Sequence, residues 1–342
     1  MLETLLPPLQ RWLLFSGVIL VVGAVTWRGI LVPRLRYRLT DGRLEHEAEH
    51  PEVTRAEARV AGLAMWVSAL LMVTWGLRLW AQYLDFRDPF TSVEEDLRFL
   101  LLETDWGIVW MAQGGIIALL VVGFFILRRR AGATPPPEPG LTPEGVTRTT
   151  PPVLELPLRW KAAAMGILLL VLTLGLSSHA MSVPGSRTLA VSVDMMHTLA
   201  AGGWIGTLLL ILITARPRSE GGRTFLALQL AAFSPLAMVA VGTLVFMGIL
   251  LTIFHTHEIA ALWESEYGRR LSGKVALAGG AMLLGLWNWR RGLPALVRAD
   301  GKEGARAAEH VWRSAAFEVA LAALVVLATA ILVATPVPPG AH

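Results

Sequence analysis

The chain has 342 residues, of which 54% are hydrophobic, 16% are charged and none is cysteine. A soluble domain would carry about a quarter charged residues, and the lack of cysteine excludes disulfides, zinc–thiolate sites and thiol redox chemistry. The net charge of +4 does not indicate a nucleic-acid partner, because the basic residues gather at the ends of apolar runs.

Eight apolar segments are each long enough to cross the hydrocarbon core of a bilayer, which takes about 20 residues. The first lacks the basic start and small-residue cleavage site of a signal peptide, so we expect it to be retained. The sequence therefore predicts an all-α, polytopic membrane helix bundle with about eight transmembrane helices. In chain order the predicted spans are 12–33, 60–84, 105–127, 158–181, 189–215, 225–254, 270–290 and 312–335.

The connections between these spans alternate in basic character. Nineteen Lys and Arg residues lie in one alternating set, and only seven lie in the other set and the two chain ends. Basic connections stay on the cytoplasmic side of a membrane. We therefore expect both termini on the outer, periplasmic side of the bacterial cytoplasmic (inner) membrane. The basic set comprises residues 34–59, 128–157, 215–224 and 290–313.

Residues 128–157 are rich in Pro, Gly and Thr, which predicts an extended cytoplasmic linker without a core of its own. The linker separates an N-terminal three-helix membrane segment, residues 1–127, from a five-helix membrane domain, residues 158–342. No nucleotide-binding or hydrolase motif stands in a suitable context. We therefore expect no enzymatic activity and no step driven by the chain's own ATP hydrolysis.

Histidines inside the predicted spans favour one side of the membrane. Ionisable groups in lipid are functional candidates, because lipid penalises them. Thioethers beside imidazoles, in a chain without cysteine, favour copper. The alternative role is structural, since a buried His can join two helices and Met commonly fills a core. The histidines expected near the outer face are His179, His197, His255 and His257, and the nearby methionines are Met181, Met195 and Met196.

Within the fifth predicted span, Asp194, His197, Ala201 and Trp204 are spaced three, four and three residues apart. This spacing places them on one helix face. A carboxylate one turn from an imidazole can orient the ring for metal binding, which is the role we expect for Asp194. Ala201 and the glycines of "GGWIG" should let neighbouring helices approach closely.

Glu318 is the other ionisable group expected inside a span, about two turns from the inner end of the last one. It could form a structural ion pair with Arg290 or Arg291, or it could serve as a step in an ion path. Arg28 and Lys274 lie near span ends, where long side chains reach the interface. We expect no chemistry from these two residues.

Five segments occur in an order that resembles the copper resistance protein D (CopD) family over about residues 155–340. The segments "HTLAAGGWIG" and "YGRRLSGK" are the most specific. The first three helices resemble, less specifically, the extra N-terminal helices of longer members. The five segments are "SSHA" (177–180), "MHTLAAGGWIGTLLL" (196–210), "SPLAMVAVGTLVFMGILL" (234–251), "YGRRLSGKVAL" (267–277) and "TPVPP" (335–339).

This resemblance implies an inner-membrane protein that moves copper inward, often beside a separate periplasmic copper carrier of the CopC type. His179 and His197 match the family's histidine positions and take a ligand role from it, whereas His255 and His257 rest on membrane depth alone. Copper binding only at the outer face, and assembly as a homo-oligomer, are compatible with the same residues. The alternative is a haem b electron-transfer protein that uses His197 with His179 or His255 as axial ligands.

Overall fold

The computed structural model describes residues 2–39, 51–88, 90–131, 156–177, 187–255, 264–299 and 301–333. Over these residues the regular elements are all helical, which confirms the predicted all-α class. The π-helical segments carry the label η. In chain order the elements are α1 (Leu2–Thr26), η1 (Trp27–Leu31), α2 (Val32–Leu39), α3 (Pro51–Phe86), α4 (Val93–Leu102), α5 (Asp105–Ala131), α6 (Leu158–Leu176), α7 (Arg187–Ala201), η3 (Gly202–Gly206), α8 (Thr207–Thr214), α9 (Glu220–His255), α11 (Glu266–Trp287), η4 (Asn288–Gly292), α12 (Leu293–Arg298) and α13 (Gly301–Val333).

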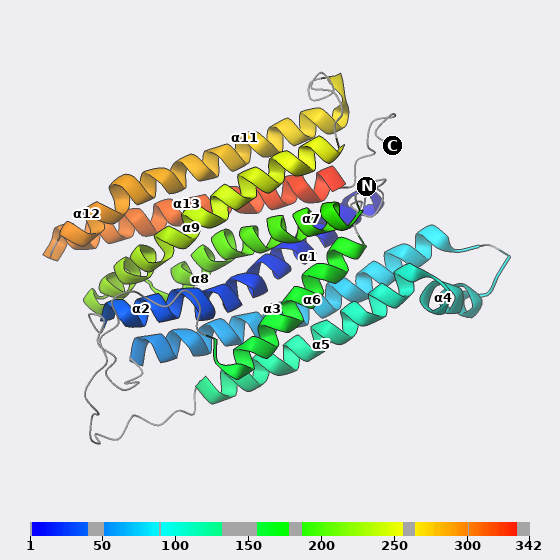
Figure 1. Cartoon of the computed structure of the whole chain (residues 1–342), viewed down its shortest axis with the longest axis horizontal. Coiled ribbons are helices and arrows are strands. Elements are labelled where there is room, and N and C mark those ends of the chain that lie inside the picture. The colour runs from blue at the N-terminus through cyan, green and yellow to red at the C-terminus, as the bar shows by residue number, and fades with distance from the viewer. Residues whose placement is uncertain are drawn as a thin grey trace.

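The long helices run back and forth along the bundle, so that α1 begins and α13 ends at the same end (Figure 1). Among the described residues, seven helices are long and apolar enough to cross a membrane. The pass formed by α11, η4 and α12 packs against α13, and Lys274 and several glycines lower its hydropathy. Polytopic architecture is thus confirmed. The seven helices that are long and apolar enough are Pro7–Arg38, Pro51–Phe86, Asp105–Ala131, Leu158–Leu176, Arg187–Thr214, Glu220–Ile253 and Gly301–Val333.

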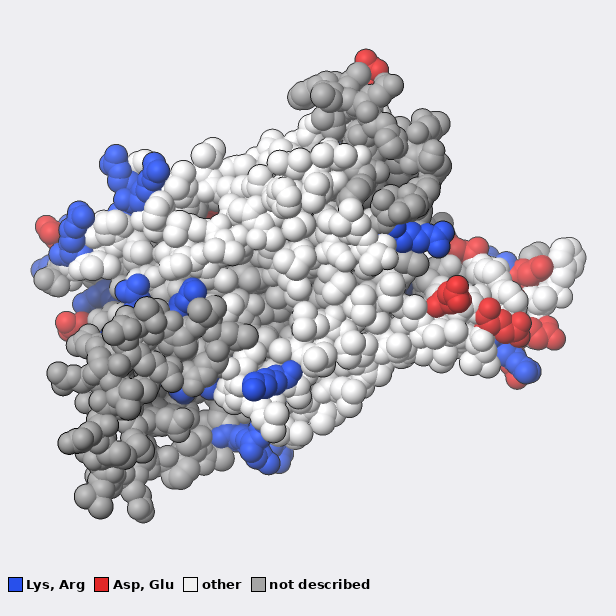
Figure 2. All heavy atoms as spheres, viewed as in Figure 1, with Lys and Arg blue, Asp and Glu red and all other residues white. Residues whose placement is uncertain are grey.

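Basic and acidic side chains gather at opposite ends of the bundle. In Figure 2, Lys and Arg dominate the described surface at the end where α2 and α12 lie, and Asp and Glu gather around α4 at the other end. A capping box formed by Ser92 and Glu95 begins α4, an arrangement that satisfies free N–H groups of the first turn. Basic residues mark the cytoplasmic ends of spans, and the beginning of α1 and the end of α13 lie at the opposite end of the bundle (Figure 1). The location of the termini on the outer side of the membrane stays a prediction.

The centre of the bundle depends on a close approach between α1 and η3. A Cβ atom added to Gly23 would lie 2.4 Å from the backbone carbonyl carbon of Gly206, and one added to Gly202 would lie 2.4 Å from Val22 Cβ. Side chains at these positions would force the helices apart, because such distances fall well inside van der Waals contact. The expected role of the "GGWIG" glycines in close packing is confirmed.

Indole N–H groups join neighbouring helices at several depths. Trp12 donates to the Ala323 carbonyl, so α1 is tied to α13, and Trp312 donates to the Leu212 carbonyl, which ties α13 to α8. A buried indole N–H needs an acceptor, and backbone carbonyls on facing helices supply it. These tryptophans therefore fix the relative positions of the helices that surround the candidate site.

Arg28 does not reach toward the interface as we expected from the sequence. Its Nε lies 2.9 Å from Glu57 Oε1 of α3, and its side chain is 7% exposed. The same oxygen accepts a hydrogen bond from Trp160 Nε1 of α6 at 2.9 Å. A buried charge needs a partner, so the pair Arg28–Glu57 joins three helices as a structural contact.

Candidate functional site

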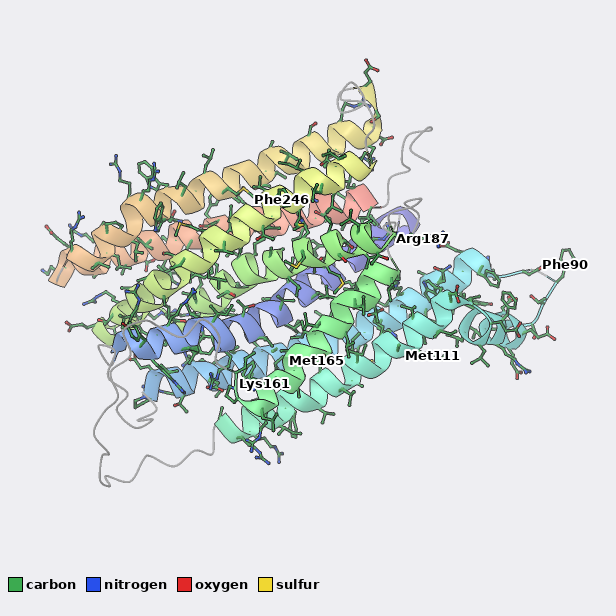
Figure 3. The ribbon with its side chains drawn as sticks, in the orientation of Figure 1. Phe90, Met111, Lys161, Met165, Arg187 and Phe246 are labelled. Atoms are coloured by element: carbon green, nitrogen blue, oxygen red, sulfur yellow. The ribbon has the colours of Figure 1, made fainter. Side chains whose placement is uncertain are left out.

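The helix pair α7 and α9 encloses His197, the central residue of the predicted metal site. Figure 3 marks the two helices by Arg187, at the beginning of α7, and Phe246, on α9. His197 lies ten residues after Arg187, which is about 15 Å along the helix axis. Its imidazole lies beside the backbone of Leu244 on α9.

The second ring nitrogen of His197 is the notable atom. Nδ1 is buried and makes no hydrogen bond with any part of the chain that the structure describes. Gly248 leaves room for the ring, because a Cβ atom there would lie 3.7 Å from His197 Cε1. A neutral imidazole that donates through one nitrogen presents a lone pair on the other, which is the form that binds metals. A metal-ligand role for His197 therefore stays a prediction, with Nδ1 as the available nitrogen.

Lys274 adds a charge that we did not expect to take part from the sequence. Its ammonium group on α11 is electrostatically attracted to Asp194 and repels a charged His197. Asp194 and His197 are on α7, one turn apart. The charge of Lys274 therefore acts on two side chains of α7. The carboxylate of Asp194 offsets that charge, and His197 is repelled by it when protonated.

The two methionines beside His197 occupy different environments. Met196 is 45% exposed on the outside of α7. Met195 packs toward α6, where its Cγ would lie 3.6 Å from a Cβ atom added to Gly175. Met195 therefore serves the core, and a ligand role for Met196 would require its thioether to turn inward from the helix surface.

Four predicted ligands fall where their side chains are outside the described part of the chain: His179, Met181, His255 and His257. Over the described residues, no group of three or more His, Cys, Asp or Glu side chains has a metal-binding arrangement. His197 is thus the predicted histidine ligand whose side-chain position is described.

Glu318 lies near the middle of α13 and is 4% exposed. Its Oε1 accepts a hydrogen bond from Trp204 Nε1 of η3 at 3.1 Å, and its Oε2 accepts one from Asn288 Nδ2 of η4 at 3.2 Å. Ser314, one turn earlier on α13, donates to Asn288 Oδ1 at 2.6 Å. Three helical passes thus converge on one carboxyl group.

The ion pair that we considered between Glu318 and Arg290 or Arg291 does not form. Both arginines are exposed, and Arg291 lies over the ring of Trp287 with its Cζ 5.4 Å from the ring centroid. The partners of Glu318 are instead the uncharged donors Trp204 and Asn288. The sequence analysis did not predict that these two residues donate hydrogen bonds to Glu318. The position of Asn288 inside an apolar segment could have indicated a polar partner in the bundle.

Both donors to Glu318 come from π-helical segments. Trp204 lies within η3 and Asn288 begins η4. A π-helical turn inserts one residue into an α-helix, which redirects the side chains after it, and such turns occur frequently at functional sites. The carboxyl group is thus held by two irregular segments that the α-helical periodicity of the sequence does not reveal.

Two family models match parts of the chain. The family model described as "Copper resistance protein D" matches residues 227–332, and that described as "Copper resistance protein D-like, N-terminal domain" matches residues 1–136. The second match includes the three N-terminal helices, which showed only a weak resemblance by sequence motif. The two matches together include α13 with Glu318, α11 with Lys274 and the ion pair between Arg28 and Glu57.

Two curated relatives are similar to part of the chain. "Copper resistance protein D" of Pseudomonas syringae pv. tomato is 32% identical over 163 residues, which is 45% of this chain and 51% of the relative. "Copper transport protein CutJ" of Bacillus subtilis (strain 168) is 25% identical over 181 residues, which is 53% of this chain and 31% of the relative. The chain therefore spans about half the length of the first relative and about a third of the second. No solved structure matches.

Proposed function

The chain belongs to the copper resistance protein D family and is a multi-pass protein of the inner membrane, and from this premise we propose that it transports copper across that membrane. Copper binds at a site near the outer face and then passes inward through the bundle. Two relatives named for copper resistance and copper transport support a copper substrate. The imidazole of His197 supplies the site's central ligand.

The unpartnered Nδ1 of His197 carries this proposal. Leaving a buried polar atom without a partner costs about 1–3 kcal/mol, and this atom makes no hydrogen bond within the described residues. A metal ion bound to Nδ1 would remove that cost. The neighbouring backbone of Leu244 on α9 would meanwhile help to hold the ring orientation, as the outer partners of metal-bound histidines commonly do.

The other ligands in the proposal come from residues that flank the outer ends of the helices. Imidazole and thioether groups suit copper, and the softer thioethers favour Cu(I). Asp194 acts through electrostatics rather than as a ligand, because it also attracts Lys274. A separate CopC-like carrier is the partner that would deliver copper. The proposed additional ligands are His179, Met181, Met196, His255 and His257.

Lys274 shapes the proposed site by its charge. Its repulsion of a charged His197 would also oppose a bound copper ion, so copper binding requires the attraction of Asp194 and the ligand atoms to exceed that repulsion. We therefore expect Lys274→Met to bind copper more tightly than the wild-type protein, and Asp194→Asn to bind it less tightly.

Elemental analysis of the detergent-purified protein tests the proposal. After incubation with copper and removal of free metal, wild-type protein should retain stoichiometric copper, and His197→Ala should lose most of it. His310→Ala is the matched control, because His310 is exposed on α13 and should leave copper binding unchanged. Equal copper in wild type and His197→Ala would contradict the site.

The same analysis separates copper handling from the haem b alternative. Stoichiometric iron in the protein as purified, with a haem absorption band lost in His197→Ala, would identify the imidazole as an axial ligand. Copper without iron, followed by copper uptake into liposomes that contain the protein, would support transport.

A further inference from the structure

Glu318 carries a buried carboxyl group in the centre of the bundle that the proposed copper site does not use. A buried carboxylate without a compensating charge is unfavourable, because the interior and the surrounding lipid solvate charge poorly. Among the described residues, Glu318 accepts hydrogen bonds from uncharged Trp204 and Asn288 and forms no ion pair. The carboxyl group therefore needs a proton or a passing cation to offset its charge.

Several charged groups on the surrounding helices either interact with other residues or are exposed. Arg28 of η1 is paired with Glu57, and Lys274 of α11 interacts with Asp194 and His197. Arg290 and Arg291 of η4 and Arg298 of α12 are exposed. Arg11 of α1 interacts with Asp85, and α8 carries no charged residue. On α9, Glu220 is exposed at the first turn and Arg223 lies in the same turn.

The hydrogen-bond network around Glu318 can satisfy both protonation states of its carboxyl group. With the carboxylate, Asn288 Nδ2 donates to Oε2 and the Ser314 hydroxyl donates to Asn288 Oδ1. If the Asn288 amide turns by half a rotation, a protonated carboxyl donates to Oδ1 and Nδ2 donates to the Ser314 hydroxyl oxygen. Amide and hydroxyl groups carry both donors and acceptors, so neither arrangement leaves a buried group unpaired. Trp204 donates to Oε1 in both states.

We infer that Glu318, Asn288 and Ser314 form a proton-binding site that releases its proton when a copper ion moves inward through the bundle. The O–H bond of the carboxylic acid breaks, the proton passes to water at the membrane surface, and the carboxylate charge offsets the charge of the copper ion. No electron is exchanged. The release step rests on the proposed copper transport, whereas the binding of a proton by Glu318 does not.

The fold provides a physical link between this proton-binding site and His197. Trp204, which donates to Glu318, follows His197 by seven residues along α7 and η3, which is about 10 Å along the axis. Charges attract over long distances in a low-dielectric interior, so a cation near His197 attracts the Glu318 carboxylate. Copper at the outer site would therefore favour loss of the Glu318 proton, so that one positive charge replaces another.

Infrared spectroscopy of the copper-free protein in lipid tests proton binding. The wild-type protein should show the carbonyl stretch of a buried protonated carboxylic acid, and Glu318→Gln should lose this band. Glu309→Gln is the matched control on the same helix, because Glu309 is exposed and paired with Arg313, and it should keep the band. An unchanged band in Glu318→Gln, or a wild-type protein without the band, would overturn the inference.

Adding copper to the same samples tests proton release. We expect the band to disappear in wild type as copper binds, and we expect Glu318→Gln to bind the same amount of copper with fewer protons released. A band that persists in copper-loaded wild type would overturn the release step. If wild type and Glu309→Gln bind no copper but show the band, the proposed copper transport fails while proton binding by Glu318 stands.

Discussion

Two buried hydrogen-bonded clusters in this bundle share one design and differ in one group. In the first, Trp27 of η1 donates to Gln229 Oε1 at 2.9 Å, and Gln229 is 0% exposed. In the second, Trp204 of η3 donates to Glu318 Oε1 at 3.1 Å. Both tryptophans lie in π-helical segments. The acceptor is a neutral amide in one cluster and a carboxyl group in the other.

The neighbours of the two acceptors differ in the same way. Gln229 Nε2 donates to the hydroxyl of Thr214 at 3.2 Å, and that hydroxyl donates to the Leu210 carbonyl at 2.7 Å. That hydroxyl also lies 3.4 Å from Gln229 Oε1, but its shorter hydrogen bond is to the backbone, which favours one direction for the chain of hydrogen bonds. Glu318 instead faces Asn288, whose amide can turn because Ser314 both donates and accepts. The first cluster holds one state, and the second accommodates two.

Exchanging the acceptors should give the largest effect. Gln229→Glu places a buried ionisable group where the Thr214 hydroxyl makes its shorter hydrogen bond to the backbone, and we expect it to destabilise the protein by about 3 kcal/mol at neutral pH. Because the folded state would hold the added proton more tightly than the unfolded state, this loss should shrink as the pH falls. Thermal unfolding in detergent at about pH 5 and about pH 8 measures it.

The reverse exchange is the control for that prediction. Glu318→Gln keeps the shape of the side chain and an acceptor for Trp204, so its stability should stay close to wild type and should not depend on pH more than wild type does. If Gln229→Glu and Glu318→Gln lower the stability of the protein equally, the two clusters do not differ in their tolerance of charge.

Crowding the carboxyl group should give an intermediate effect. A Cβ atom added to Gly285 would lie 2.8 Å from Glu318 Oε1, so Gly285→Ala should displace the carboxyl and destabilise the protein by about 1–3 kcal/mol. Gly280→Ala on the same helix is the matched control, because no atom lies within 4 Å of its added Cβ. A loss of stability as large in Gly280→Ala as in Gly285→Ala would argue against a local effect on Glu318.

Removing the hydroxyl groups should give the smallest effect. Ser314→Ala and Thr214→Ala each delete one buried hydrogen-bonding partner, which costs about 1 kcal/mol. Only Ser314→Ala should also shift the infrared carbonyl band of Glu318, because Ser314 is linked to it through Asn288. If Thr214→Ala shifts that band equally, the band does not report the Glu318 network.

The sequence predicted the fold well because membrane helices have a strong compositional signal. Long apolar runs identify spans, and the close packing of the "GGWIG" glycines followed from their size. The π-helical turns were not predictable, since one inserted residue hardly alters an apolar pattern. The pass that contains α11 is not among the seven apolar spans of the described residues, and Lys274 and several glycines interrupt its apolar sequence.

The sequence was less informative about which polar residues meet. Asp194 and His197 could be placed on one face from their spacing, but contacts between helices depend on rotation about each axis, which composition leaves open. Arg28 therefore seemed free to reach the interface, although it pairs with Glu57. Glu318 was identified as unusual from its depth, yet its partners Trp204 and Asn288 became apparent only from packing.

X-ray absorption at the copper edge of the copper-loaded protein tests the central claim most directly. We expect the scattering pattern of an imidazole ligand in wild type and in His310→Ala, and its weakening or loss in His197→Ala. A copper environment of oxygen ligands alone, or a spectrum identical in wild type and His197→Ala, would contradict the assignment of His197 as the central copper ligand.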